Sequence, residues 1–478
     1  MKCLLSVFLA CLLVLTLVLA SCGDASESGA ESAALSEESV IEATSSEEKE
    51  ISGEGSGVSE EHHETAEESE KQSEKSDEPT ESSKEEKHPH EESTTSEEPE
   101  KPVEGGIEIV YVSYSKYPYG AVVGKCAEGA VVTAKSNTDE ASARSWHGWF
   151  AVRINCPHSR TTYTFTQTVN GKQVGEPVKQ SLFPVTPSSD MWPIIVGKDS
   201  QLFLQKMLPD FQQTNVPADS AFTSFSERVA AHLQQLRGIK NNAEIIYMVV
   251  PSCMTVYPEL VPEQYKQGTG KSKLDKTLEA AKKGGATVID LRTAFAAHKN
   301  DEMPLYYKFD SHWTEYGAFV AYTELFEEIG KRFPASKPRS IDEFDWRGKS
   351  YESGDMVYYL QMEREVVHDY GYLRVMKFDD KSGASKVQRY LNSDRLTYSD
   401  YVTWENTHIS GDQNKPSALI LRDSYSTQIY DILAERFNKT HFAGMWSYSW
   451  NIAQISKDKP DYVIYILSEW NIDSILYS

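Results

Sequence analysis

The sequence predicts an α/β protein with a doubly wound, mainly parallel sheet and helices on both of its faces. Short apolar runs of strand length recur from residue 188 onward, and segments with helical spacing of apolar residues lie between them. Alternating short strands before residue 188 predict a small antiparallel β-sandwich that precedes this domain. An acidic segment with scarcely any large apolar residue predicts a disordered N-terminal stalk.

The N-terminus has the pattern of a secretory signal. A charged start precedes an apolar run from Leu4 to Leu19, and small residues follow it. The tetrad Leu19-Ala20-Ser21-Cys22 resembles the lipobox of bacterial lipoproteins, in which the cysteine carries the lipid. We therefore expect a signal peptide over residues 1–21 and a lipid-anchored protein on the bacterial cell surface. An uncleaved anchor helix is the alternative, which the short apolar run disfavours.

Residues 22–105 are expected to form the stalk. From Asp24 to Glu100 the chain has 27 acidic residues against 5 lysines, and this stretch holds −22 of the formal net charge of −24. Such a composition cannot bury enough apolar surface to offset chain entropy. A flexible chain of about 80 residues reaches on the order of 50 Å. The rest of the chain is near neutral, which argues against a nucleic-acid partner.

Residues 106–187 are predicted to form the β-sandwich. Apolar and polar residues alternate in segments 107–112, 130–134 and 161–166, turn signals such as Asn170-Gly171 separate strands, and no helical pattern interrupts them. The domain resembles bacterial Ig-like surface modules. Its aromatic residues Trp146, Trp149 and Tyr163 form either a sugar-stacking face or part of the core, and core packing is favoured because aromatic residues dominate the cores of small sandwiches.

Three cysteines remain after the signal and the lipidation site. Cys126 and Cys156 lie in the predicted β-sandwich and are a possible disulfide in an oxidising compartment, although spacing alone does not establish the geometry. Cys253, in the following domain, is expected to be free and buried.

The domain over residues 188–478 contains four apolar runs that predict buried parallel strands. The runs are Ala243–Val250, Ala286–Leu291, Ser417–Leu421 and Asp461–Leu467. Amphipathic helices are predicted between them, one with Phe225, Val229, Leu233 and Leu236 and one with Phe319, Tyr322, Phe326 and Ile329. Ligands of such sheets bind beyond the carboxyl ends of the strands, so functional residues are expected directly after these runs.

The segment Asp310-Ser311-His312-Trp313 supplies the first chemical signal. In an extended segment, residues two apart project to the same side, so the Asp310 carboxylate can bind one ring nitrogen of His312. That contact would fix the imidazole tautomer and leave the other nitrogen to act as a general base and then as an acid.

The second signal is Ser424, which follows the predicted strand ending at Leu421 and precedes a segment of helical periodicity. A strand-to-helix turn lifts the hydroxyl above the sheet edge and brings helix N-terminal amides near a developing anion. Ser424 is the predicted nucleophile. An ordinary N-cap serine and a structural histidine are the alternatives, and the joint placement of both signals favours catalysis.

Two other sites compete with this one. Ser252 and Cys253 follow the first apolar run, but no acid and histidine pair lies near them in the sequence to activate a weak nucleophile. Metal binding by Asp310 and His312 is disfavoured because the domain shows no complementary His or Glu cluster. We expect no metal and no organic cofactor.

Four blocks of the domain, in their order, resemble the alginate O-acetylation proteins of the AlgX and AlgJ type, also called the DHHW or SGNH-hydrolase-like acetyltransferase family. The blocks are Val196-Gly197-Lys198-Asp199 with Leu202-Phe203; Val250-Pro251 with Val256-Tyr257-Pro258-Glu259; Tyr306 to Trp313 with Gly317-Ala318; and Arg422 to Ser426 with Lys459 to Ile464. The resemblance covers residues from about Trp192 to Ser478.

This resemblance implies an SGNH-hydrolase-like fold and a triad of Asp310, His312 and Ser424. It also implies ping-pong transfer, in which the serine takes acetyl from a donor and a sugar hydroxyl accepts it. The acceptor would be an extracellular or cell-wall polysaccharide, and a membrane-bound O-acyltransferase would supply the acetyl group. The chain order Asp, His, Ser is compatible with a triad, because triads are defined by geometry and role.

The chain departs from the family pattern beside the nucleophile and after the last strand. Arg422 stands where many members have glycine, and Glu469-Trp470 stands where Glu-Arg is frequent. Arg422 either contributes positive charge near the oxyanion, points into solvent or pairs with Asp423. The other candidates for substrate or oxyanion contacts are Tyr425, Trp313, Tyr448 and Glu469, and Trp446, Trp450 and Trp470 are further candidates for sugar stacking.

Three functions are compatible with these signals. The first is transfer of acetyl through an acyl-Ser424 intermediate to a polysaccharide hydroxyl. The second is an acetyl esterase with the same triad and water as the acceptor. The third is a glycan-binding lipoprotein without activity, which the presence of Asp310, His312 and Ser424 disfavours.

Overall fold

A computed structural model describes residues 105–114, 118–183, 194–352, 354–360, 367–391 and 405–478. The predicted signal peptide, the lipidation site Cys22 and the acidic stalk lie outside these residues. Within the described ranges, no helix combines the length and the apolar character that a membrane span requires.

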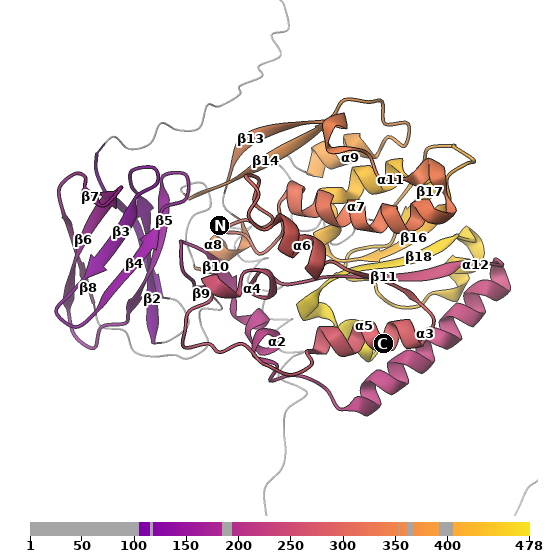
Figure 1. Cartoon of the computed structure of the whole chain (residues 1–478), viewed down its shortest axis with the longest axis horizontal. Helices are drawn as coiled ribbons and strands as arrows, with labels where there is room; N and C mark the ends of the chain where they lie inside the picture. The colour runs from indigo at the N-terminus through magenta and orange to yellow at the C-terminus, as the bar shows by residue number, and fades with distance from the viewer. Residues whose placement is uncertain (1–104, 115–117, 184–193, 353, 361–366, 392–404) are drawn as a thin grey trace, which may run out of the picture. The chain divides into compact units, whose positions relative to one another are not determined.

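The N-terminal part of the described chain consists of two antiparallel sheets (Figure 1). One has the order β1-β2-β5, and in the other β4-β3-β6-β7 are joined by β8, which pairs with β6. The strands are β1 (Glu108–Tyr114), β2 (Tyr119–Lys125), β3 (Val131–Lys135), β4 (Glu140–Arg144), β5 (Trp149–Asn155), β6 (Thr161–Val169), β7 (Lys172–Gln173) and β8 (Val178–Leu182). Inward residues of both sheets form one apolar cluster, which includes Phe150 and Val152 from β5 and Tyr163 and Phe165 from β6. This arrangement is an antiparallel sandwich.

The aromatic residues of the sandwich pack inside it or against its neighbours. Tyr163 is fully buried in the sandwich core, and Trp149 is buried as well. The Trp146 indole is partly buried and donates a hydrogen bond of 3.1 Å to Asp369 Oδ1. Core packing is therefore confirmed for Trp149 and Tyr163, and the alternative of a sugar-stacking face is wrong for these two residues.

The disulfide between Cys126 and Cys156 is not formed, and both thiols are free. Cys126 follows β2 at the end where Lys125 pairs with Trp149, whereas Cys156 follows β5 at the opposite end, where Asn155 pairs with Tyr119. The two positions are thus separated by the length of the strand pair, on the order of 20 Å at the rise of a β-strand. A disulfide requires Cα atoms less than about 7 Å apart, so the pairing that the sequence left possible is not formed.

A six-stranded sheet with the order β12-β11-β18-β16-β17-β15 forms the centre of the second domain. Its strands are β11 (Glu244–Val250), β12 (Thr287–Asp290), β15 (Asn406–Ile409), β16 (Ser417–Arg422), β17 (Lys439–Phe442) and β18 (Tyr462–Ser468). All pairs are parallel except β15 with β17. The four strands predicted from apolar runs are present at these positions. The edge strand β15 and its short neighbour β17 were not predicted.

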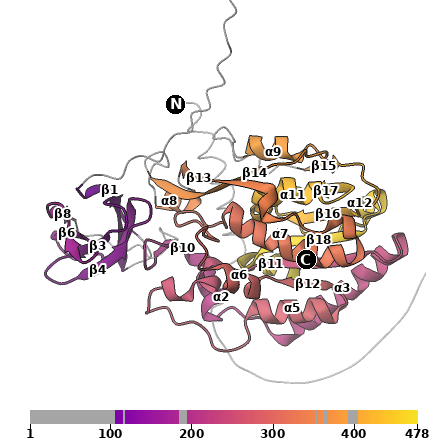
Figure 2. The same cartoon turned by 45° about the horizontal axis from the view of Figure 1, so that its top comes forward.

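Helices cover both faces of this sheet (Figures 1 and 2). One face packs against α3 (Asp219–Ile239), α5 (Lys273–Lys283), α12 (Ile452–Asp458) and α13 (Asp473–Leu476). The other packs against α6 (Arg292–His298), α7 (Glu315–Arg332) and α11 (Tyr430–Glu435). Successive residues of a strand point to opposite faces, so Ile246 and Met248 of β11 join the α7 side and Ile245 and Tyr247 join the α3 side. The predicted doubly wound α/β fold is confirmed.

A long antiparallel pair, β13 (Phe344–Glu352) and β14 (His368–Met376), lies outside the central sheet. The short helix α8 (Asp355–Tyr359) belongs to the connection between these strands. Neither the pair nor the helix was predicted from the sequence. The remaining described elements are β9 (Ile194–Val196), β10 (Leu202–Leu204), α2 (Leu208–Gln212), α4 (Cys253–Val256), α9 (Ala384–Leu391) and the 3-10 helices η1 (Gln205–Met207), η2 (Pro258–Leu260), η3 (Pro334–Ser336), η4 (Ile341–Glu343), η6 (Ser424–Ile429) and η7 (Glu469–Asn471).

Candidate active site

Ser424 lies at the carboxyl edge of the central sheet, directly after β16. It is the first residue of η6, a 3-10 helix that α11 continues. Asp423 is the N-cap, because its carboxylate accepts a hydrogen bond of 3.0 Å from the Tyr425 amide. The predicted strand-to-helix turn is therefore present, with a tighter first turn than an α-helix.

Asp423 is itself held rigidly at the end of the neighbouring strand. Its Oδ2 accepts hydrogen bonds from the amide and hydroxyl of Ser468 at 2.8 and 2.9 Å, and from the Asn471 side chain at 3.0 Å. These contacts tie β16 to the end of β18. As a result, the position of Ser424 is determined by both strands.

The second segment of the site is a tight loop between Tyr306 and Trp313, which pair as an isolated antiparallel bridge. The Phe309 amide donates to Asp369 Oδ2 at 2.6 Å, and the Gln201 side chain donates to the Tyr307 carbonyl at 3.0 Å. Helix α7 starts directly after this loop, where Thr314 caps it by accepting a hydrogen bond from Gly317. The loop is thus anchored at both ends by the surrounding fold.

Gly317 allows this close packing of α7 against the loop. A Cβ atom built at that position would lie 2.2 Å from the Leu305 carbonyl oxygen, closer than real Cβ contacts. Any side chain at residue 317 would push the start of α7 away from the segment that carries Asp310 and His312.

The structure brings Asp310, His312 and Ser424 into one hydrogen-bonded chain. His312 Nδ1 lies 2.7 Å from Asp310 Oδ1, and His312 Nε2 lies 2.7 Å from Ser424 Oγ. Both distances are typical of good hydrogen bonds. The geometry is that of a nucleophile, a base and an orienting acid.

The backbone around Asp310 and His312 is bent, not extended as the sequence argument assumed. Asp310 Oδ1 also accepts a hydrogen bond of 2.8 Å from the His312 amide. The carboxylate therefore closes a local turn on the backbone and binds the ring of the same residue. The predicted contact is present, but a side-chain turn produces it and strand alternation does not.

Burial and charge act in opposite directions on the imidazole. Burial alone lowers the pKa of His312, but the charge and hydrogen bond of Asp310 outweigh it and the pKa rises to about 9. The Asp355 and Asp423 carboxylates add to the rise. For Asp310, burial raises the pKa, but the facing His312 charge and hydrogen bonds hold it below its usual value. The pair therefore favours a carboxylate beside an imidazolium.

Asp355, the first residue of α8, is a further carboxylate at the site. Donor atoms of Asp310, His312 and Asp355 lie within 4.8 Å of one another, a spacing that a metal ion could also use. Both ring nitrogens of His312 are, however, engaged by Asp310 and Ser424. A metal would have to displace one of these partners, so the geometry favours proton transfer over metal binding.

Gly354 lies directly against the orienting acid. A Cβ atom at this position would stand 1.6 Å from Asp310 Oδ2. We expect Gly354→Ala to displace the Asp310 carboxylate and to lower kcat with an activated acetyl ester about 10- to 100-fold, because misplacement on the order of 1 Å has this effect. Steady-state kinetics with an activated acetyl ester measures it. Gly383→Ala is the control, since no atom lies within 4 Å of a Cβ at that position. Its own cost is backbone strain, because the φ of Gly383 is +72°. Equal losses of kcat in both variants would contradict the prediction.

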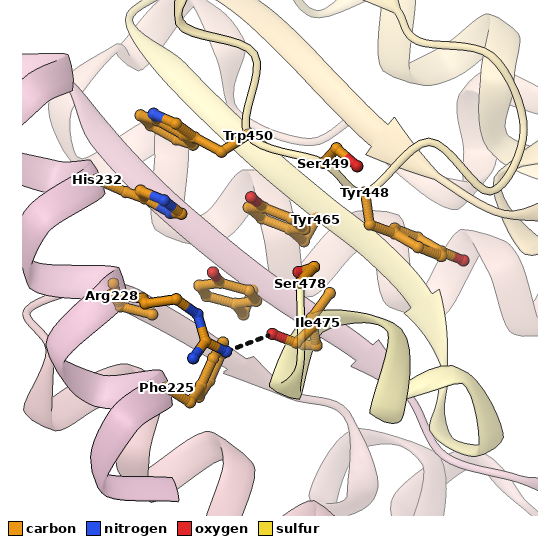
Figure 3. A pocket seen from close by; sticks show the side chains of 11 residues that line it. Phe225, Arg228, His232, Tyr448, Ser449, Trp450, Tyr465, Ile475 and Ser478 are labelled. Atoms are coloured by element: carbon orange, nitrogen blue, oxygen red, sulfur yellow. Dashed lines mark hydrogen bonds between the residues drawn. The ribbon is translucent and has the colours of Figure 1, made fainter. Parts of the chain in front are cut away.

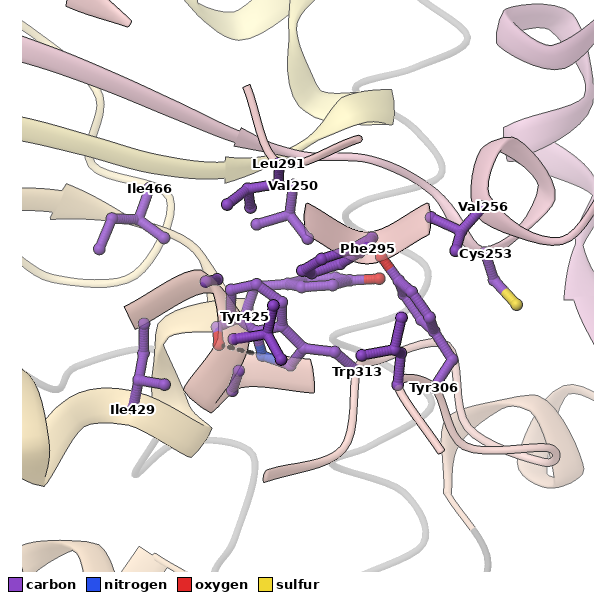
Figure 4. Close-up of a cluster of buried hydrophobic side chains, with 14 of the residues drawn as sticks. Val250, Cys253, Val256, Leu291, Phe295, Tyr306, Trp313, Tyr425, Ile429 and Ile466 are labelled. Atoms are coloured by element: carbon purple, nitrogen blue, oxygen red, sulfur yellow. Dashed lines mark hydrogen bonds between the residues drawn. The ribbon is translucent and has the colours of Figure 1, made fainter. Parts of the chain in front are cut away.

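Trp313 and Tyr425 pack in one buried apolar cluster (Figure 4). The Trp313 indole donates a hydrogen bond of 2.8 Å to the Tyr425 carbonyl, and the Tyr425 hydroxyl donates to the Ser311 carbonyl at 2.5 Å. Trp313 is completely buried and Tyr425 nearly so. Their predicted role as substrate contacts is therefore wrong, because neither ring has a free face for a sugar. They hold the loop that carries Asp310 and His312 against the turn that carries Ser424.

Glu469 and the competing site at Ser252 are buried together at the ends of β18 and β11. Glu469 accepts hydrogen bonds of 2.7 Å from the Ser252 amide and the Thr255 hydroxyl, and burial raises its pKa. The Ser252 hydroxyl caps α4 by accepting from the Thr255 amide. Burial raises the pKa of the Cys253 thiol to about 12, which leaves it protonated and unreactive. These residues have structural roles, so Glu469 is not a substrate contact.

Arg422 is completely buried at the end of β16, so the alternative in which it points into solvent is wrong. Burial lowers the pKa of its guanidinium to about 10. One terminal nitrogen lies 3.4 Å from Ser426 Oγ, and its backbone carbonyl accepts from the Trp446 amide at 2.8 Å. Its side chain stands behind the nucleophile turn and does not line a surface for substrate.

Tyr448 lies by a separate cavity of about 270 Å³ on the α3 side of the sheet (Figure 3). Aromatic rings line much of it, including the stacked pair His232 and Trp450 and the stacked pair Tyr247 and Tyr465. None of Asp310, His312 and Ser424 lines this cavity. Trp450 is thus placed away from the triad, whereas the Tyr448 hydroxyl approaches Asp423, the residue directly before Ser424.

Three residues near the triad had no signal in the sequence: Asp355, Gly354 and Lys206. Lys206 of η1 holds its Nζ 4.6 Å from the ring centroid of Trp470, and that ring packs on Tyr425. Burial lowers the pKa of Lys206, and the charges of Asp355 and Asp423 oppose this shift. The positions of these residues follow from tertiary packing, because each is far from Ser424 along the chain.

Residues 194–386 match a family model described as the SGNH hydrolase-like domain, acetyltransferase AlgX. The matched stretch contains Asp310, His312 and Asp355 and ends before Ser424. No curated protein matches the chain.

Solved structures similar to the chain include three from bacteria. The O-acetyltransferase domain of Pseudomonas putida AlgJ is 14% identical with a TM-score of 0.37, and the match covers 60% of this chain and 93% of that one. A DHHW family protein from Eubacterium siraeum is 14% identical with a TM-score of 0.40, covering 65% and 94%. Bacillus cereus PatB1 is 17% identical with a TM-score of 0.40, covering 54% and 93%.

Proposed function

We propose that this protein is a cell-surface O-acetyltransferase that acts on a polysaccharide. Residues 194–386 match the family model described as SGNH hydrolase-like domain, acetyltransferase AlgX, which supports this proposal. The observation that carries the proposal is the hydrogen-bonded chain from Asp310 through His312 to Ser424. A hydroxyl is a weak nucleophile unless a base lies within hydrogen-bonding distance and is itself oriented. All three parts are present in this protein at the edge where α/β sheets bind their ligands.

The first half of the proposed reaction transfers acetyl to the enzyme. Ser424 Oγ attacks the carbonyl carbon of an acetyl ester while His312 Nε2 takes the hydroxyl proton. The tetrahedral intermediate then collapses, the bond to the donor oxygen breaks, and the imidazolium returns the proton to the departing alcohol. Asp310 keeps the other ring nitrogen protonated and stabilises the imidazolium charge.

The second half transfers acetyl to the acceptor. A sugar hydroxyl replaces the donor alcohol, His312 Nε2 takes its proton, and the oxygen attacks the acetyl-Ser424 ester. Collapse of this intermediate releases the O-acetylated sugar and returns the proton to Ser424 Oγ. Water in place of the sugar hydroxyl would give an esterase through the same intermediate.

The backbone amide of Ser424 is the candidate donor for the oxyanion in both halves. Of the first three amides of η6, that of Tyr425 donates to the Asp423 carboxylate and that of Ser426 donates to the Asp423 carbonyl at 3.4 Å. Asp423 therefore occupies two of the amides that a helix N-terminus was expected to offer, and only the Ser424 amide is not committed to Asp423.

The localisation of this activity rests on the N-terminal sequence. A lipid on Cys22 and an acidic stalk over residues 22–105 would hold the catalytic domain at a distance on the order of 50 Å from the membrane. A membrane-bound O-acyltransferase that exports acetyl groups is the proposed donor partner, and a surface polysaccharide is the proposed acceptor.

Trapping of the acyl-enzyme tests the proposal. The protein is incubated with an activated acetyl ester, digested and mapped by mass spectrometry, and then offered oligosaccharides. We expect acetyl on Ser424 and its discharge to a sugar. Acetyl release at the same rate without oligosaccharide would identify an esterase, and labelling of any other residue in place of Ser424 would overturn the site.

The rate of acylation is expected to rise with pH up to about 9. The general base must be neutral to accept the Ser424 proton, and the carboxylate partners hold the pKa of His312 at about 9. Below that pH the imidazole is mostly protonated, so kcat/KM should fall about tenfold for each unit of pH. A profile of kcat/KM against pH, corrected for spontaneous ester hydrolysis, measures it. A profile that is flat between pH 7 and 9 would contradict this expectation.

A further inference from the structure

The Asp355 carboxylate binds Ser311, the residue between Asp310 and His312. The Ser311 amide donates to Asp355 Oδ1 at 2.8 Å, and the Ser311 hydroxyl donates to Asp355 Oδ2 at 2.5 Å. Ser311 is almost completely buried, so water does not compete for these contacts. One carboxylate therefore clamps both polar groups of Ser311, and this clamp fixes the turn between Asp310 and His312.

The same residue also contacts the orienting acid. The Asp355 amide donates to Asp310 Oδ2 at 3.2 Å, which leaves Asp310 Oδ1 to the His312 ring and amide. Gly354 permits this approach, since no side chain fits between α8 and the carboxylate. Asp355 thus touches the acid through its backbone and the loop through its side chain.

We infer that Asp355 is a positioning residue for acyl transfer, which holds the Asp310-Ser311-His312 turn and adds a second negative charge beside the imidazole. The inference rests on the proposed function. Asp355 takes no proton from substrate in this role. It acts through Ser311 and His312, in contrast to the nucleophile and the base.

The charges around His312 support this role. Carboxylates face it from three elements: Asp310 from its own loop, Asp355 from α8 and Asp423 from the turn before η6. The Lys206 ammonium, from η1, interacts with two of these carboxylates: the charges of Asp355 and Asp423 act to raise its pKa against the effect of burial. When His312 accepts a proton in the reaction, it becomes a cation in a partly buried site, and each nearby carboxylate stabilises that cation. Of these three carboxylates, Asp355 is the one that also binds the amide and the hydroxyl of Ser311.

The variant Asp355→Asn removes the negative charge of residue 355 and keeps its hydrogen bonds to Ser311. The amide oxygen accepts from the Ser311 amide, and the amide nitrogen donates to the Ser311 hydroxyl, which can turn to accept. The clamp is kept and the charge is lost. We expect the acidic limb of the kcat/KM profile and the imidazole titration of His312 by NMR to move down by about 1 pH unit. We also expect kcat at high pH to fall about tenfold, the factor that corresponds to one such unit.

Two further variants complete the design. Ser311→Ala removes the hydroxyl contact and keeps the charge, so kcat should fall several-fold with the His312 titration unchanged; it also tests the clamp should Asp355→Asn not fold. Asp380→Asn is the matched control, because Asp380 also binds both polar groups of one serine: its Oδ1 accepts from the amide and the hydroxyl of Ser382, at 2.9 and 2.6 Å. It should change neither the pH profile nor kcat.

The NMR titration distinguishes failure of this inference from failure of the proposed function. An unmoved His312 titration in Asp355→Asn, or an unchanged kcat in Ser311→Ala, would overturn the role of Asp355 while acetyl still forms on Ser424. If no acetyl formed on Ser424 in the wild-type protein, the proposed function would fail, and a shifted titration would still support the charge of Asp355 on His312.

Discussion

Replacement of Ser424 by alanine is expected to abolish acetylation of the protein and to lower kcat for acetyl transfer by a factor on the order of 10⁴ to 10⁶. The hydroxyl removed is the one that lies 2.7 Å from His312 Nε2, and no other nucleophile shares that contact among the described residues. The loss should appear in kcat, because binding surfaces for donor and acceptor are unchanged. Acyl-enzyme mapping by mass spectrometry and steady-state kinetics measure the two effects.

Ser252→Ala is the matched control, since Ser252 follows β11 as Ser424 follows β16. Its hydroxyl caps α4, so its removal should lower the free energy of unfolding by about 1 kcal/mol and leave the acyl-enzyme intact. The reverse pattern, with labelling lost in Ser252→Ala and retained in Ser424→Ala, would transfer the nucleophile to the other strand.

Asp310→Asn is expected to lower kcat about 10⁴-fold, the effect of the equivalent change in serine proteases. In this protein Asp310 Oδ1 accepts from the ring and the amide of His312, and Oδ2 accepts from the Asp355 amide. An asparagine places its NH₂ group against one of these donors whichever way it is turned, and its neutral amide no longer stabilises an imidazolium. Kinetics at the pH optimum, with circular dichroism to confirm folding, measure the change.

Asp301→Asn is the control for this variant. Asp301 binds His298 Nδ1 at 2.7 Å, the same distance as in the triad, but no serine completes that pair. Its loss should leave kcat within about a factor of two, as expected of a surface ion pair. A loss of similar size in both variants would indicate a general effect of carboxylate removal and would remove the special role of Asp310.

Local sequence signals were sufficient to locate the strands and helices whose buried residues recur at a regular spacing. Apolar runs located β11, β12, β16 and β18, and helical spacing located α3 and α7, because burial on two faces or on one stripe leaves a periodic trace. The short strands β15 and β17 and the pair β13 and β14 were missed, since short or partly exposed strands carry no such trace. The possible disulfide rested on the presence of Cys126 and Cys156 in one small domain. It is not formed, because the two cysteines lie at opposite ends of a strand pair.

The residues of the candidate site divide in the same way. Asp310 and His312 are two residues apart, and Ser424 follows a buried strand, so their types and local setting were visible in the sequence. Trp313 and Tyr425 were visible as well, but their burial against each other was not, and it changed their assignment from substrate contacts to support. Asp355 and Gly354 had no local signal, because a loop residue acquires its role only from the distant residue it meets.

The sequence by itself determined the alternation of the main strands and helices, the three residues of the proposed triad and the sheet edge at which they lie. The tertiary structure alone decided that His312 meets Ser424, that Asp355 clamps Ser311, and that the side chains around them are buried. The physical reason is range: hydrophobic periodicity and turn chemistry act between residues close in the chain, whereas a hydrogen bond between His312 and Ser424 spans 112 positions and exists only when the sheet has formed.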